Sequence, residues 1–98
     1  MVTCRSEEEA RKISGRLLAK RLVACASILP KIKSRFWWKG KIDSATELLL
    51  TMKTVRSNFK KIEAQVKRLH SYEIPEIIAL PISLGSRDYL DWISQTVI

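Results

Sequence analysis

The sequence predicts an α+β fold in which helices cover one face of an antiparallel sheet. Apolar residues recur at helical spacing in some segments and at every second position in others, which predicts helices and strands respectively. These segments follow the order β-α-β-β-α-β-α along the 98 residues, with no internal repeat and no break in composition. The length suits a modest hydrophobic core, so we expect one domain over residues 1–98.

The chain is expected to open with a short strand and a long helix. Residues 1–4 predict the end of a strand. Ser6 then begins a capping box with Glu9, in which the serine side chain caps the helix and the glutamate lies three residues later. The apolar stripe that follows predicts a helix over residues 6–21, with acidic residues at its start and basic residues at its end, as the helix dipole favours.

A long hairpin is expected over residues 22–54, because the apolar period changes from helical to two at this point. Pro30 predicts a bulge or bend in the first strand, since proline cannot donate a hydrogen bond to a neighbouring strand. Gly40 predicts the turn, and the second strand is expected over residues 45–54.

The second half of the chain again alternates between a predicted helix and a predicted strand. Helical spacing predicts a helix over residues 57–70, and a short apolar run, followed by Gly85 and Ser86, predicts a strand over residues 74–82. Ser86 can cap a short final helix. The complete order is that of a ferredoxin-like fold, βαββαβ, with an extended hairpin and an additional C-terminal helix.

The strand at residues 74–82 predicts an oligomer. Apolar residues occupy both of its faces, and a strand of this kind is covered on both sides. One layer of helices covers only one face of a sheet. The hairpin over residues 22–54 is also too long for a monomer of this size, and a long unpaired edge promotes association. We therefore expect other copies of the chain to cover these surfaces.

The charge and composition limit the classes of partner. Eighteen basic against ten acidic residues give a net charge of +8, which admits nucleic acid, an anionic membrane surface or an anionic ligand. No apolar run is long enough to span a bilayer, and the N-terminus lacks the apolar region of a secretory signal. The two cysteines have no CxxC spacing, so we expect reduced thiols in a cytoplasmic protein without a membrane partner.

The hairpin carries a stripe of basic residues interrupted by Trp37. Basic residues interleaved with aromatic ones are typical of nucleic-acid surfaces. The signature of RNA-recognition domains is absent, however, and a solvated face is the commoner explanation, so nucleic acid is not the expected partner. The stripe consists of Lys31, Lys33, Arg35, Lys39 and Lys41.

Few residues predict chemistry on their own. His70, the one histidine, follows the helix at residues 57–70 and is either a partner of the helix dipole or a metal ligand. Glu76 shares an apolar strand face and needs a partner, for which Lys53 is the candidate. Cys4 and Cys25 are interpreted as small buried apolar residues. Phosphate-binding glycine loops and hydrolase motifs are absent, so we expect no enzyme.

Seven segments together resemble the CutA family, the divalent-cation tolerance proteins. They occur in the family's order and cover nearly the whole chain. In place of the proline that the family usually carries after the histidine, this chain has Ser71, which loosens the corner that positions His70. The segments are Val2–Cys4, Ser6–Ala10, Lys20–Ala26, Trp38–Gly40, Glu47–Thr54, His70–Ile77 and Tyr89–Trp92.

The resemblance implies a homotrimer without catalysis, with a role in tolerance of copper or another divalent cation that folding does not require. It implies His70 and Glu76 as metal ligands, with Cys25 nearby. A metal or small ligand is then expected in clefts between subunits. Two alternatives stay open: a basic nucleic-acid-binding module, and a trimeric signalling protein that binds a small anion. The residues expected to line the cleft are Trp38, Lys53, Tyr72, Glu73 and Glu47.

Overall fold

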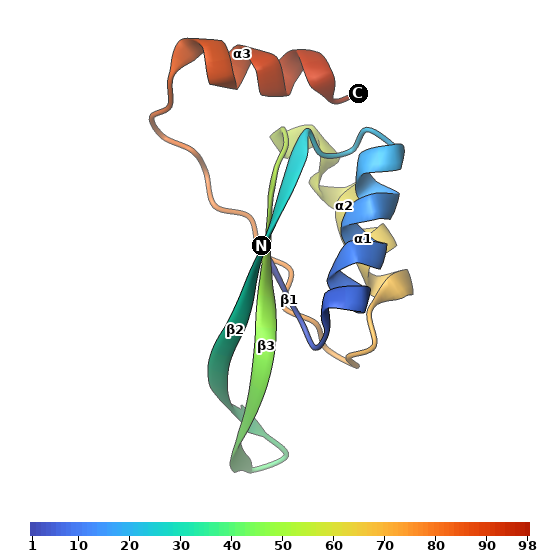
Figure 1. The fold of residues 1–98 in the computed structure, drawn as a ribbon, viewed down its shortest axis with the longest axis vertical. Helices are drawn as coiled ribbons and strands as arrows, with labels where there is room; N and C mark the ends of the chain where they lie inside the picture. Colours follow the sequence, from blue (N-terminus) through green and yellow to red (C-terminus); the bar gives the residue numbers. More distant parts are fainter.

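A three-stranded antiparallel sheet in the order β1-β3-β2 organises the computed structural model, which describes residues 1–98. Its strands are β1 (Val2–Cys4), β2 (Cys25–Trp38) and β3 (Lys41–Lys53). Helices α1 and α2 cover one face of the sheet, and the β2–β3 hairpin extends well beyond them (Figure 1). The predicted α+β class is confirmed.

Helix α1 (Glu7–Ala19) begins as its capping signal predicts. The Ser6 side chain accepts a hydrogen bond from the Glu9 backbone N–H at 3.1 Å. The helix ends near the predicted position, just before Arg21, whose φ of 55° lies in the left-handed region. Its inner face contributes the fully buried Ile13 and Leu17 to the core.

The hairpin confirms both backbone predictions. The register between β2 and β3 shifts between Leu29 and Ile32, so Pro30 lies in a bulge. The turn lies at Lys39 and Gly40, with φ values of 50° and 78°; two successive positive values are typical of the tight turns that match strand twist. β3 begins at residue 41 rather than 45, because pairing across a tight turn requires no apolar side chains.

Helix α2 (Phe59–Leu69) follows a short 3-10 turn, η1 (Arg56–Asn58), so the helix predicted over residues 57–70 divides into two elements and begins one residue earlier. Asn58 is buried and its side-chain amide donates to the Leu22 carbonyl at 3.1 Å, which ties this turn to the chain leaving α1. The core lies between α1, α2 and the sheet. It consists of Val2, Cys4, Ala10, Ile13, Leu17, Leu22, Val23, Leu50, Ile62 and Val66.

The prediction of a strand over residues 74–82 is wrong for the single chain. The segment makes one isolated bridge, between Ile77 and Val2, and Ile78 shares backbone hydrogen bonds with Met1. Prolines at positions 75 and 81 have no N–H to donate, and the neighbouring β1 is only three residues long. The segment therefore has too few backbone hydrogen-bond partners to form a continuous strand.

Helix α3 (Arg87–Thr96) lies beyond the open end of the hairpin, at the opposite end of the molecule from the hairpin turn (Figure 1). Ser86 occupies the predicted capping position, although its side chain makes no capping hydrogen bond. Arg21 donates from its Nε to the Thr96 carbonyl at 3.0 Å, and Ile93 is buried. None of the helices is long and apolar enough to cross a membrane.

Candidate functional site

Three elements bring a thiol, a carboxylate and an imidazole together beneath the sheet edge. Cys4 ends β1, Glu9 lies in the first turn of α1, and His70 caps the C-terminus of α2. Their ligand atoms all lie within 4.8 Å of one another. All three side chains are nearly or fully buried, with exposed fractions of 0% for the side chain of His70, 9% for Glu9 and 0% for Cys4.

The hydrogen bonds of His70 select one neutral tautomer. Its Nε2 lies 2.8 Å from the Thr3 carbonyl oxygen, which can only accept, so this nitrogen carries the proton. Its Nδ1 accepts from the Tyr72 backbone N–H at 3.1 Å. A charged dipole partner at the helix end is therefore not the arrangement found. The Nδ1 lone pair, which could bind a cation, faces Glu9 and the loop at Tyr72.

Glu9 is held by backbone donors from both sides of the site. Its carboxylate accepts from the Arg5 N–H at 3.1 Å and from the Ser71 N–H at 2.8 Å. Burial by itself raises the pKa of Glu9, but the hydrogen bonds that its carboxylate accepts from Ser71 and Arg5 outweigh burial, so the pKa lies below its ordinary value. Glu9 is therefore ionised at neutral pH.

A second buried carboxylate lies beside this group. Glu47 accepts a hydrogen bond from the Tyr72 hydroxyl at 2.8 Å, and it is only 5% exposed. Burial, together with the negative charges of Glu9 and Glu47, raises the pKa of the Cys4 thiol to about 12. Burial and the bond to Glu47 likewise raise the pKa of Tyr72. The cluster therefore combines negative charge with a protonated thiol.

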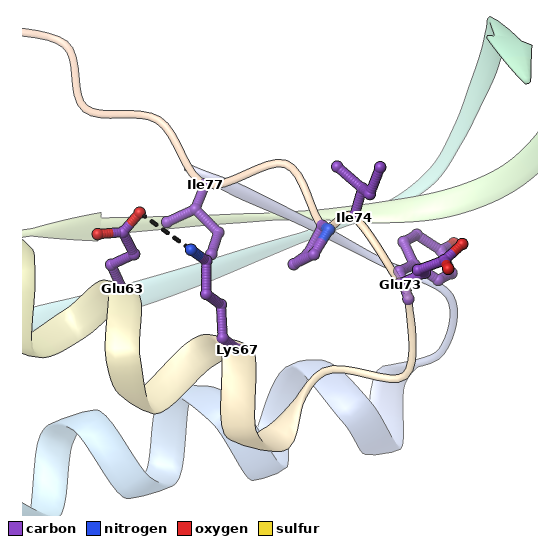
Figure 2. Close-up of a pocket in the computed structure, with 7 residues that line it drawn as sticks. Glu63, Lys67, Glu73, Ile74 and Ile77 are labelled. Atoms are coloured by element: carbon purple, nitrogen blue, oxygen red, sulfur yellow. Dashed lines mark ion pairs between the residues drawn. The ribbon is translucent and has the colours of Figure 1, made fainter.

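A surface pocket of about 450 Å³ adjoins the buried cluster. It lies between α2 and the segment that follows it, with the Lys67–Glu63 ion pair on one side and Ile74 and Ile77 on the other (Figure 2). Tyr72 lines the pocket and also donates to Glu47, so its side chain connects the pocket with this buried carboxylate.

The remaining predicted residues do not gather at one place within a chain. Trp38 lies at the hairpin turn and Lys53 at the open end, roughly 40 Å apart along β3 at about 3.3 Å per residue. Cys25 lies opposite Lys53, with its Sγ 3.4 Å from the Tyr89 hydroxyl. Glu76 is exposed, and no ion pair joins it to Lys53.

Of the predicted residues, His70, Tyr72 and Glu47 do lie together, and Glu73 lines the adjoining pocket. Sequence reasoning missed the two other ligand donors of the cluster around His70. Cys4 was interpreted as an apolar residue and Glu9 as part of a capping box. The available signal was topological: in the predicted order, the end of the first strand and the end of the second helix both lie at one edge of the sheet.

Glu9→Gln tests the contribution of this carboxylate to folding. We expect a loss of about 1–3 kcal/mol in the free energy of unfolding at neutral pH, because an amide cannot accept both backbone N–H bonds. The pKa of Glu9 is lowered on folding, so its contribution is present above the unfolded value of 4.5 and is lost as the pH falls through the folded value. Urea unfolding at several pH values measures this.

Glu8→Gln is the matched control for Glu9→Gln. It removes the same charge from the same helical turn, but at an exposed residue. A dipole effect alone would make the two variants equally unstable at neutral pH. Equal losses would therefore contradict the structural role given to Glu9, as would an undiminished difference between wild type and Glu9→Gln in acid.

The CutA1 divalent ion tolerance protein family model matches residues 1–96. The divalent-cation tolerance protein CutA of Archaeoglobus fulgidus is 49% identical over 96 residues, covering 98% of this chain and 93% of that protein. The protein of the same name from Thermus thermophilus is 45% identical over 95 residues, covering 97% and 92%.

Solved structures agree with these matches. The divalent cation tolerance protein Cut A1 from Thermus thermophilus superposes with a TM-score of 0.95 at 45% identity, covering 98% of this chain and 93% of that one. The structure described as the periplasmic divalent cation tolerance protein CutA from Archaeoglobus fulgidus gives 0.95 at 48% identity, covering 99% and 94%. The chain therefore belongs to the CutA family of divalent-cation tolerance proteins.

Proposed function

We propose that the protein acts in divalent-cation tolerance by binding the cation itself, without catalysis, at Cys4, Glu9 and His70. The observation that carries the proposal is the convergence of their ligand atoms within 4.8 Å. In a tetrahedral site with metal–ligand bonds of 2.0–2.3 Å, neighbouring donor atoms lie about 3.3–3.8 Å apart. The three donors must therefore move together by about 1 Å to share a cation.

The donor set favours copper or zinc over magnesium or calcium. Thiolate and imidazole are ligands of copper and zinc, whereas magnesium and calcium prefer sites built from oxygen alone. The ionised Glu9 and the adjacent Glu47 add negative charge that favours a cation. Copper is the ion we propose, in line with the role that the resemblance implies.

Binding requires two changes in the cluster. Cys4 must release its proton, and the Nδ1 of His70 must exchange the Tyr72 N–H for the cation. The backbone between His70 and Tyr72 favours the second change. Ser71 stands where the family usually has proline, so the backbone at this corner between α2 and the following segment is less restrained. The pocket lined by Tyr72 is the surface feature next to the cluster, and it supports a route for the cation past this side chain.

We also propose a homotrimer, in which this pocket becomes a cleft between subunits. In the single chain, the segment after Tyr72 makes one bridge and leaves a row of large apolar side chains in solvent. Exposed apolar area of this extent is typical of a surface covered by a partner. The row consists of Ile74, Ile78, Leu80, Ile82 and Leu84. Cys25 and Glu76 remain candidate ligands of a site between subunits, because neither belongs to the cluster around His70 in the single chain.

Calorimetric titration of the protein with copper(II) and with zinc tests the proposed function. We expect one cation per chain and an affinity that rises about tenfold per pH unit near neutrality, because a thiol with a pKa of about 12 must release one proton for each cation bound. Repeating the zinc titration in buffers of different ionisation enthalpy counts the protons released. No binding, or affinity indifferent to pH, would contradict the proposed site.

A further inference from the structure

Glu47 is a buried carboxylate beside the proposed cation site, but it is not one of the three converging ligands. It is 5% exposed, and its Oε2 accepts a hydrogen bond from the Tyr72 hydroxyl at 2.8 Å. The ligand atoms that lie within 4.8 Å of one another belong to Cys4, Glu9 and His70. No lysine or arginine forms an ion pair with Glu47. A buried charge without such a partner is unfavourable for folding, which indicates a role in binding rather than in stability.

The pairing of β1 with β3 places Glu47 close to Cys4. Cys4 lies opposite Leu48 in the antiparallel register, and Glu47 is the preceding residue of β3. Burial is the main cause of the raised pKa of the Cys4 thiol, and the charges of Glu9 and Glu47 raise it further. The negative charge of Glu47 therefore acts on the sulfur atom that is proposed to hold the cation.

The surroundings of Glu47 are provided by its own chain. Because the residue is almost fully buried in the single chain, a neighbouring copy can contact little of it. The Tyr72 hydroxyl orients the carboxylate, and hydrogen bonds to a charged group are among the stronger ones. The place of this charge beside Cys4 therefore does not depend on the surfaces that other copies of the chain are expected to cover.

We propose that Glu47 is a specificity-determining residue, which makes the site at Cys4, Glu9 and His70 select divalent over monovalent cations. This inference rests on the cation site of the proposed function. The Coulomb energy between Glu47 and a bound ion is proportional to the charge of the ion, so it is twice as large for a divalent as for a monovalent cation. Burial excludes the water that would screen this interaction. Glu47 needs no bond to the ion to have this effect.

The three ligands leave the charge of the cation open. A thiolate such as that of Cys4 binds copper(I) as well as zinc, and imidazole binds both copper and zinc. Ligand chemistry alone therefore admits a monovalent soft cation at this site. An additional buried negative charge that stays outside the coordination sphere supplies the missing discrimination, and Glu47 has both properties.

Competition titrations with zinc(II) and silver(I) test the inference on Glu47→Gln. Silver(I) is the monovalent probe, in chloride-free buffer, and every protein carries Cys25→Ser so that Cys4 is its one thiol. The glutamine carbonyl can still accept from the Tyr72 hydroxyl. We expect the zinc affinity to fall by about the square of the factor by which the silver affinity falls, and the ratio of the two affinities to fall at least about tenfold. Both ions displace the same thiol proton, so this step cancels from the ratio.

Glu47→Asp and Glu8→Gln are the matched controls. The first retains the charge at the same position, and the second removes a charge from an exposed residue, so both should keep the ratio of the Cys25→Ser protein. Equal losses for zinc and silver in Glu47→Gln, or an unchanged ratio, would overturn this inference and leave the cation site standing. A changed cobalt(II) spectrum in Glu47→Gln would also overturn it, because Glu47 would then be a ligand. Failure of the Cys25→Ser protein to bind either ion would contradict the proposed function itself.

Discussion

Cys4→Ser and His70→Ala are each expected to lower the affinity for copper(II) and zinc by more than the ten- to hundred-fold that loss of a supporting residue around a metal site costs. The reason is that each change removes a donor atom from a set of three that converges within 4.8 Å. Serine does not replace a thiolate for these ions. Titration of each purified variant under the conditions used for wild type measures the loss.

Two further variants distinguish this site from one that needs a second copy. Cys25→Ser and Glu76→Gln alter the candidate ligands that lie outside the cluster, and they should bind as wild type does if Cys4, Glu9 and His70 hold the cation. Urea unfolding of every variant checks that the fold is intact. Loss of affinity in Cys25→Ser or Glu76→Gln, with Cys4→Ser unaffected, would move the site to the boundary between subunits.

The double change Leu80→Glu with Ile82→Glu is expected to reduce the particle from three chains to one. Leu80 is 67% exposed and Ile82 is 50% exposed in the single chain. If a neighbouring copy covers them, each new carboxylate must be desolvated there, which costs several kcal/mol per ion. Light scattering should give three times the 11.3 kDa of one chain for wild type and one times that mass for the variant.

Leu18→Glu is the control for this change, because Leu18 is also exposed, at 41%, but lies on α1 rather than in the segment after α2. It should leave the trimer intact. A wild-type mass near that of one chain, or a double variant that keeps the mass of wild type, would contradict the trimeric assembly.

The fold was largely predictable because its strongest signals are local. Ser6 with Glu9 begins α1, the turn falls at Gly40, and the bulge falls at Pro30, where the backbone chemistry of single residues decides the outcome. The segment 74–82 was predicted as a strand from its run of apolar residues alone. A strand also requires a partner edge, and β1 offers only three residues, so a local pattern could not decide this element.

The site was predictable only in part, because long-range docking places its residues. His70 was identified from its chemistry, but its contacts are to Thr3 and Glu9, far away in the sequence. Which carboxylate and which thiol it meets depends on how the end of α2 packs beside β1. Trp38 and Lys53 lie at opposite ends of the hairpin within one chain, so their place in a cleft between subunits stays a prediction.

The most direct test of the cation site is the absorption spectrum of the protein with cobalt(II), a probe that substitutes for zinc. A cobalt–thiolate bond gives an intense charge-transfer band, and oxygen and nitrogen ligands do not give this band. We expect this band, at one cobalt per chain, in wild type and in Cys25→Ser, and its absence in Cys4→Ser. A band that persists in Cys4→Ser, or that disappears in Cys25→Ser, would contradict binding at Cys4, Glu9 and His70.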